Sequence, residues 1–215
     1  MIYNAETEYI DALIAHTEET LRLLSNDEKS KWERMICAAF LRCLGVRFSP
    51  ANVESPKNDP PDVTFKEANF EVRELLDEGR RRGDEYKEKY EILTKAKNIE
   101  DTFLPCKSNT PISYQKLFDI IAIALSGKAN HYGRQGCSSL DALVYINLLN
   151  RFLDPATRIP TSESLISQGW RSVSFVLIPY SHVIFAKHNA PIFLRSNEGQ
   201  TKKEWDDPDT FFELM

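Results

Sequence analysis

Apolar residues recur every three or four positions at the start of the chain, which predicts two amphipathic helices. Residues 6–24 carry the first apolar stripe. Ser25 followed by Glu28 matches the capping pattern that begins a second helix. The second stripe covers residues 32–44 and stops at Gly45, a residue type that often ends a helix in the left-handed conformation. We expect the two helices to pack on each other and on a following sheet.

Shorter apolar runs later in the chain predict a sheet. Residues 140–149 are almost continuously apolar, which is typical of a central strand buried on both faces, although a buried helix would give the same pattern. Further strands are predicted over residues 46–53, 62–65, 70–73, 173–178, 183–186 and 192–195. The pattern therefore predicts an α/β (α+β) fold with a mixed central sheet of about five to seven strands flanked by helices.

Three more helical segments are predicted between and after these strands. Residues 77–100 contain seven basic and seven acidic residues with a thin apolar stripe, which indicates an exposed helix whose charges cancel. Thr110 and Pro111 match the start of another helix, with a core face over residues 114–125 and an end in the loop 126–134. Residues 161–168 predict a short helix.

Length and composition indicate one globular domain. The chain has 215 residues, of which 42% are hydrophobic and 27% charged. We expect a single domain over residues 1–196, made of a helical pair (5–45) and a core (46–196), followed by a polar acidic tail (197–215). The tail contains Trp205, Phe211 and Phe212, which offer a docking surface if the protein is purely structural.

The net charge and the lack of targeting signals argue against several classes of protein. The net charge of −5 argues against a protein that coats nucleic acid non-specifically. No apolar run approaches the roughly 20 residues of a membrane helix, and the N-terminus lacks a signal peptide, so we expect a cytoplasmic protein. The four cysteines show no metal-binding spacing and are expected to be buried free thiols.

The strongest chemical signal lies in the predicted hairpin. If Phe65 pairs with Phe70, Asp62 lies opposite Arg73, and two carboxylates share the non-core face with Arg73. The second carboxylate is Glu71. Paired carboxylates bind Mg²⁺ or Mn²⁺, and a nearby cation binds phosphate. The hairpin is therefore a candidate metal site, although an ordinary turn with a polar solvent face would have the same residues.

The spacing of these residues resembles a known signature. Pro61-Asp62, followed after eight residues by Glu71-Val72-Arg73, is similar to the active-site motif of the PD-(D/E)XK nuclease superfamily. The whole chain also resembles a bacterial family of unknown function whose members are described as endonucleases. The resemblance implies a restriction-endonuclease-like core, Mg²⁺ or Mn²⁺ held by Asp62 and Glu71, and nucleic acid as the partner, DNA before RNA.

The chain departs from that motif at one position. Arg73 stands where the superfamily has lysine, and a guanidinium cannot take a proton from water. Arg73 can still hold a phosphate. Lys128 is the candidate to replace the missing lysine.

Further phosphate and base contacts are expected from residues outside the motif. The candidates are Arg80, Arg81, Arg82, Lys128, Tyr132 and Arg134, although ordinary solvated surface loops, the default interpretation, would have the same residues.

The sequence leaves two principal functions open. The first is a metal-dependent nuclease that uses Asp62, Glu71, Arg73 and Lys128 as catalytic residues. The second is a catalytically inactive protein of nuclease fold that serves as a binding or regulatory module, which the Arg73 departure favours. We expect no membrane partner, and a homodimer is left open.

Overall fold

The chain divides into two compact units in the computed structural model, which describes residues 2–104 and 108–203. The first unit contains residues 1–32 and 78–108, and the second contains residues 33–77 and 109–215. Two segments that are distant in sequence therefore form the first unit, which interrupts the second. The predicted single domain over residues 1–196 stays a prediction.

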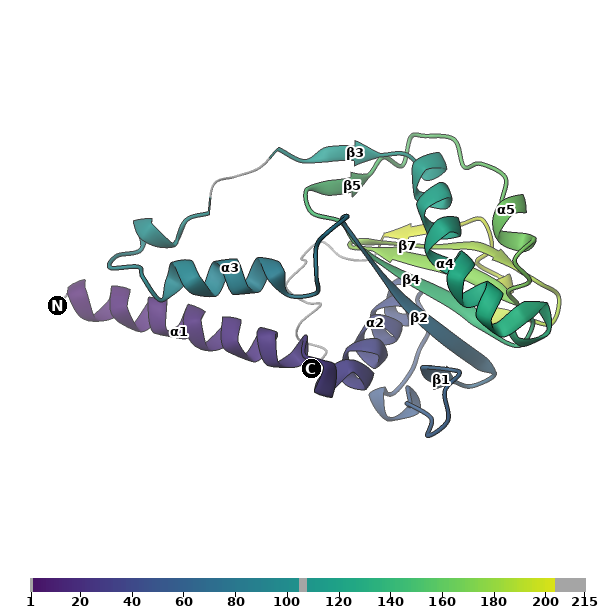
Figure 1. The fold of residues 1–215 in the computed structure, drawn as a ribbon, viewed down its shortest axis with the longest axis horizontal. Coiled ribbons are helices and arrows are strands. Elements are labelled where there is room, and N and C mark those ends of the chain that lie inside the picture. Colours follow the sequence, from purple (N-terminus) through teal and green to yellow (C-terminus); the bar gives the residue numbers. More distant parts are fainter. Residues whose placement is uncertain (1, 105–107, 204–215) are drawn as a thin grey trace. The chain divides into compact units, whose positions relative to one another are not determined.

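The first unit is helical (Figure 1). It contains α1 (Ile2–Leu23) and α3 (Asp84–Leu93), with short 3-10 turns η1 (Asn26–Glu28) and η3 (Glu100–Thr102). The Tyr90 hydroxyl donates to Glu18 at 2.8 Å and so ties α3 to α1. Leu93 is the buried residue of α3. Because the other side chains of this helix are at least partly exposed to water, most of them can be charged.

A six-stranded mixed sheet forms the centre of the second unit, as the sequence predicts. Its order is β1-β2-β4-β6-β7-β8. The strands are β1 (Val63–Phe65), β2 (Ala68–Leu76), β4 (Asp141–Asn147), β6 (Ser172–Leu177), β7 (Tyr180–Ala186) and β8 (Thr201–Lys203). β2, β4 and β6 are parallel, and the outer strands are antiparallel to their neighbours. A separate parallel pair joins β3 (Thr110–Ile112) to β5 (Arg151–Leu153).

Helices cover both faces of this sheet (Figure 1). On one face, α4 (Tyr114–Cys137) contributes Leu117 and Ile121 to a core shared with Val144 of β4. On the other, α2 (Lys29–Cys43) places Phe40 edge-on against Phe70 of β2, with ring centroids 6.0 Å apart. Strand β4 is therefore buried on both faces, as its apolar run predicts.

The end of α2 follows from one glycine. Gly45 has a φ of 70°, and its N–H donates to the Arg42 carbonyl. The Val46 N–H donates to the Leu41 carbonyl, which completes the Schellman arrangement expected at a helix end. The predicted stop at Gly45 is confirmed.

Two predicted strands are not strands. Residues 46–53 contain a 3-10 turn, η2 (Pro50–Asn52), because Pro50 has no N–H to donate to a ladder. Residues 192–195 form a short helix, α6 (Ile192–Arg195), in which Leu194 is buried and Ile192 is 73% exposed. Four apolar residues fit either structure, so the pattern could not decide.

Helix α4 has different ends from those predicted. Thr110 and Pro111 belong to β3, and the cap is Ser113, whose side chain accepts the Lys116 N–H at 3.3 Å. The helix does not end at residue 126 but continues to Cys137, with a kink at Gly133. The buried residues Ala129 and Cys137 account for this, because tertiary packing outweighs the weak helix propensity of glycine.

The short helix predicted over 161–168 is observed as α5 (Glu163–Ile166). Cys37, Cys43 and Cys137 are buried free thiols, and Cys106 lies outside the described residues. The tail predicted from residue 197 begins instead with a turn and β8, while residues 204–215, with Trp205, Phe211 and Phe212, lie outside the described part. Within the described ranges, no helix has the length and apolar character needed to cross a membrane.

Candidate metal centre

The hairpin that carries the predicted acids has a shorter turn than expected. Val63 lies opposite Phe70, so the turn is the dipeptide Lys66-Glu67. The predicted pairing of Phe65 with Phe70 across four residues is wrong. Two-residue turns are usually marked by glycine or asparagine, whereas here Lys66 itself adopts a φ of 50°. The sequence therefore contained no signal for this turn.

The observed register brings the two acids together. Extending the ladder by one residue places Asp62 across from Glu71, where the predicted register had placed Arg73. The Asp62 N–H donates to the Phe70 carbonyl at 3.0 Å, and Asp62 Oδ2 accepts the Val72 N–H at 2.9 Å. These backbone bonds hold the Asp62 carboxylate at the strand entrance.

The shift of two residues leaves every side chain on its predicted face. Val63, Phe65 and Phe70 are at most 1% exposed, on the face that α2 covers. Glu71 points to the opposite face, which α4 covers rather than solvent. The predicted polar side of the hairpin is thus partly buried.

A third carboxylate joins the pair. One oxygen each from Asp59, Asp62 and Glu71 lies within 4.8 Å of the others. Exposure falls along the series, from exposed Asp59 through half-buried Asp62 to Glu71, which is 1% exposed. Asp59 was not among the predicted site residues. Its place three residues before Asp62, across two prolines, is the signal that could have indicated it.

Glu71 is held by two side chains of α4. The Lys128 ammonium lies 2.5 Å from Oε1, and the Tyr132 hydroxyl donates to Oε2 at 3.1 Å. Burial raises the pKa of Glu71 more than the contacts with Lys128 and Tyr132 lower it, and the nearby Asp62 carboxylate adds to the rise. Removing water thus makes the ionised form of Glu71 costly, which a cation at this position relieves.

Lys128 reaches the cluster because α4 continues past its predicted end. Lys128 and Tyr132 are four residues apart on the helix and so share a face. Lys128 Nζ also donates to the Tyr132 hydroxyl oxygen at 3.1 Å. Burial lowers the pKa of Lys128, but its contacts with Glu71 and Tyr132 raise it further, so the net change is upward. The side chain therefore stays an ammonium ion at neutral pH.

Arg73 lies elsewhere on the same strand. It is exposed, and its backbone pairs opposite Val144 of β4. Within the described residues, no hydrogen bond or ion pair joins Arg73 to Asp59, Asp62 or Glu71. The structure thus brings together Asp62, Glu71 and Lys128, and leaves Arg73 on the surface of β2.

The other arginines predicted to contact phosphate lie in different units of the chain. Arg80, Arg81 and Arg82 belong to the first unit. Arg80 is paired with Glu85 through hydrogen bonds of 3.3 and 3.2 Å, and only 8% of its side chain is exposed. Arg134 is exposed on α4, beyond the kink.

The cluster offers the ligands that a hard divalent cation prefers. All three potential donors are carboxylate oxygens, and the group contains no histidine or cysteine. Glu71 Oε1 is buried and lies 2.5 Å from the Lys128 ammonium, so this oxygen already contacts one cation. An ionised carboxylate has about four lone-pair sites, so the contacts of Glu71 with Lys128 and Tyr132 leave sites for a metal ion. The donor set therefore fits Mg²⁺ or Mn²⁺.

The fold and the site define a mixed α/β protein with a carboxylate cluster at the entrance of an internal sheet strand, contacted by a helix lysine. The chain belongs to the family described as "Putative endonuclease, protein of unknown function (DUF1780)", which it matches over residues 5–206. The predicted resemblance to a family of this description is confirmed. Membership of the PD-(D/E)XK superfamily stays a prediction.

A solved structure is similar over nearly the whole chain. It is a protein of unknown function, PA4535, from Pseudomonas aeruginosa strain PAO1, named as a member of a monooxygenase superfamily. The two chains are 30% identical, with 92% of this chain and 95% of the other covered and a TM-score of 0.67. No curated protein matches the sequence at a significant level. The family and the neighbour thus carry names from different reaction classes, so the site itself must carry the functional argument.

Proposed function

We propose that the protein is a metal-dependent nuclease that hydrolyses phosphodiester bonds in nucleic acid, DNA before RNA. One observation carries the proposal: the carboxylates of Asp59, Asp62 and Glu71 converge within 4.8 Å, and the Lys128 ammonium touches the most buried of them. Acids at the entrance of a sheet strand, with a primary amine beside them, are what the PD-(D/E)XK resemblance implies. The family description is consistent with this reaction.

Each residue of the cluster has a distinct task in this proposal. Asp59, Asp62 and Glu71 would hold Mg²⁺ or Mn²⁺, which when bound activates water and neutralises charge on the phosphate. The Val72 N–H orients Asp62, while Tyr132 and Lys128 hold the two oxygens of Glu71. Lys128 supplies a cation for the charge that develops on phosphate oxygens. Because its pKa is raised, Lys128 acts here as a fixed charge rather than as a base.

One feature favours a second candidate, a binding or regulatory module without catalysis. Lys128 already neutralises Glu71 without a metal ion, so the buried carboxylate is compensated in the protein alone. Such a pair can be retained for stability after catalysis is lost. Arg73 at the motif's lysine position is consistent with this candidate.

Metal binding is tested by calorimetric titration of Mn²⁺ into the wild type and Asp62→Asn. Asparagine keeps an oxygen that can accept the Val72 N–H, so the hairpin is preserved while one charged ligand is lost. We expect binding in the wild type and at least tenfold weaker binding in the variant, because a carboxylate is a far better Mn²⁺ ligand than an amide. Glu67→Gln is the matched control, an exposed carboxylate in the turn of the same hairpin.

Cleavage of single- and double-stranded DNA and RNA then separates the two candidates. Wild type, Asp62→Asn and Glu67→Gln are purified in parallel, so that a contaminating nuclease appears in all three. We expect Mn²⁺- or Mg²⁺-dependent cleavage that Asp62→Asn abolishes and Glu67→Gln retains. Metal binding without cleavage of any of the four substrates would leave the non-catalytic module as the function.

A further inference from the structure

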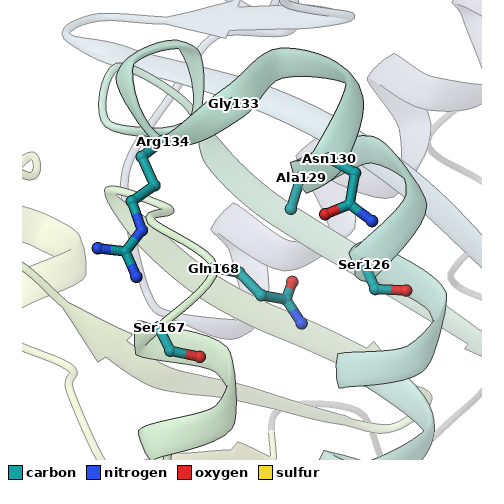
Figure 2. A pocket seen from close by; sticks show the side chains of 7 residues that line it. All are labelled: Ser126, Ala129, Asn130, Gly133, Arg134, Ser167 and Gln168. Carbon is teal, nitrogen blue, oxygen red and sulfur yellow. The ribbon is translucent and has the colours of Figure 1, made fainter.

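A pocket of about 320 Å³ lies between α4 and the segment that follows α5. Its polar wall is formed by Ser126, Asn130, Arg134, Ser167 and Gln168 (Figure 2). None of the described residues that line it is Asp or Glu. An arginine in a concave site without carboxylates creates a positive potential, which favours an anionic ligand.

Two of the lining side chains have donors available for a ligand. No described residue accepts a hydrogen bond or an ion pair from the Arg134 guanidinium or the Asn130 amide. In contrast, Ser126 and Ser167 donate their hydroxyl hydrogens to helix carbonyls at 2.7 and 2.9 Å. A guanidinium fork and a carboxamide are groups that bind the oxygens of a phosphate.

The backbone fixes the position of Arg134. Gly133 has φ 65° and ψ 171°, which breaks the path of α4 immediately before Arg134. Gly169 packs against the other side, where an added Cβ would lie 3.1 Å from Arg134 Cα and 3.3 Å from Cγ. Figure 2 shows the Arg134 side chain extending from the kink toward Ser167. The base of the arginine is therefore held while its guanidinium is presented to the pocket.

A continuous chain of contacts joins the pocket to the carboxylate cluster within the second unit. Gln168 accepts the Trp170 indole N–H at 3.1 Å, while its own amide donates to the Ala122 carbonyl at 2.8 Å. The Trp170 ring meets the Tyr132 ring edge-on, with centroids 6.4 Å apart. The Tyr132 hydroxyl in turn donates to Glu71. The pocket and the cluster are thus connected through three packed side chains.

We propose that this pocket is a phosphate subsite, which binds a backbone phosphate of the nucleic-acid strand that is cleaved at the carboxylate cluster. The inference rests on the proposed function and specifies its substrate as a strand that occupies both places. A free nucleotide and inorganic phosphate carry the same chemical group. The strand is favoured because Arg134 and Asn130 are both exposed, so a polymer that continues beyond the pocket can reach them.

The test measures binding of a fluorescein-labelled single-stranded oligodeoxynucleotide by fluorescence anisotropy in EDTA. Leaving out divalent metal makes the result independent of cleavage. We expect Arg134→Gln to raise Kd about tenfold to a hundredfold, since it removes charge-assisted hydrogen bonds to phosphate. The slope of log Kd against the logarithm of salt concentration should become smaller by about one, the value for one lost phosphate contact.

Two further variants make the result specific to the pocket. Asn130→Asp keeps the size of an exposed residue and adds a negative charge to the wall, so it should weaken binding at least as strongly as Arg134→Gln. Arg158→Gln is the matched control, an exposed arginine of the second unit outside the pocket, and should change Kd less than twofold. Circular dichroism confirms that each variant is folded.

Competition identifies the source of the phosphate. We expect millimolar deoxyadenosine monophosphate and inorganic phosphate to displace the oligonucleotide poorly. Efficient displacement by either would assign the pocket to small phosphates and overturn the strand subsite. Equal Kd values for wild type, Arg134→Gln and Asn130→Asp would overturn it as well. If the wild type does not cleave nucleic acid but Arg134→Gln still weakens oligonucleotide binding, the phosphate subsite is supported and only the proposed catalysis fails.

Discussion

A primary amine reaches the carboxylate cluster from a helix and not from the strand that carries Glu71. The motif's lysine position holds Arg73, which is exposed, while Lys128 comes from α4 and lies 2.5 Å from Glu71 Oε1. The sequence indicated these residue types but not their arrangement. The position of Lys128 depends on where α4 ends, and the meeting of Asp62 with Glu71 depends on a turn that no glycine marks.

The two cations should differ in their effect on nucleic-acid cleavage. In the assay above, we expect Lys128→Gln to lower kcat about 10²–10³-fold, because the amine faces developing charge in a partly buried site. Arg73→Gln should lower it at most about tenfold, since an exposed charge is screened by water. The comparison of kcat for both variants with the wild type checks this. If Arg73→Gln lowers kcat more than Lys128→Gln does, then Arg73 on β2, and not Lys128, is the principal catalytic cation.

His182 is a second residue whose environment could not be predicted from its neighbours in sequence. It is fully buried on β7, among the rings of Tyr114, Phe118 and Phe175. Burial lowers the pKa of His182 to about 4, because the charged imidazole loses its hydration. Its Nδ1 lies 2.9 Å from Thr201 Oγ1. The histidine is therefore neutral in the folded protein.

This burial makes stability depend on pH in a known direction. Between pH 6.5 and about 4 the unfolded chain binds a proton at His182 that the folded protein does not. Stability is therefore complete above pH 6.5 and is lost as the pH falls toward 4, by roughly 3 kcal/mol for this group. Urea unfolding across that range should show a shallower loss in His182→Phe than in the wild type.

The control for this prediction is His188→Phe, at an exposed histidine of the same unit. Its pH profile should overlay that of the wild type. The explanation fails if His182→Phe keeps the full pH dependence, since the titration would then belong to other groups.

At the scale of elements, α4 contains a direct test of backbone conformation. Gly127 and Gly133 both have open space where a Cβ would be, but only Gly133 has a positive φ. Gly127→Ala should raise the free energy of unfolding by about 0.5–1 kcal/mol, since alanine is the better helix former. Gly133→Ala should lower it by about 1–3 kcal/mol, because its φ and ψ are almost restricted to glycine. Thermal unfolding of the two variants checks the difference, and stabilisation by both would mean that the kink is absent.

The elements themselves were predictable where packing and local pattern agree. β4, β6 and β7 combine apolar runs with burial, and Gly45 ends α2 as its residue type suggests. Prediction failed where tertiary contacts decide. Residues 192–195 form a helix, and α4 passes through Gly127, because burial of Leu194 and Ala129 determines those conformations.

At the scale of the whole molecule, the class of fold was predictable but the connection of its parts was not. A six-stranded mixed sheet flanked by helices follows from the alternation of helical and strand patterns. The order β1-β2-β4-β6-β7-β8 and the division into two units depend on contacts between distant segments. Asp141 is one such contact: its carboxylate accepts the Asn69 N–H, the Ser172 hydroxyl and the Arg171 guanidinium.

The parallel pairing of β2 with β4 also has a consequence for synthesis of the protein. The partner of β2 leaves the ribosome only after the chain between Leu76 and Asn147 has been made, including the second segment of the helical unit, residues 78–108. At about 5–20 residues per second this takes roughly 4–14 s, during which the completed hairpin has an unpaired strand edge beside Phe70. Such an edge is a template for aggregation. We expect the yield of newly made protein to depend on what shields that edge during those seconds, more than on the stability of the finished sheet.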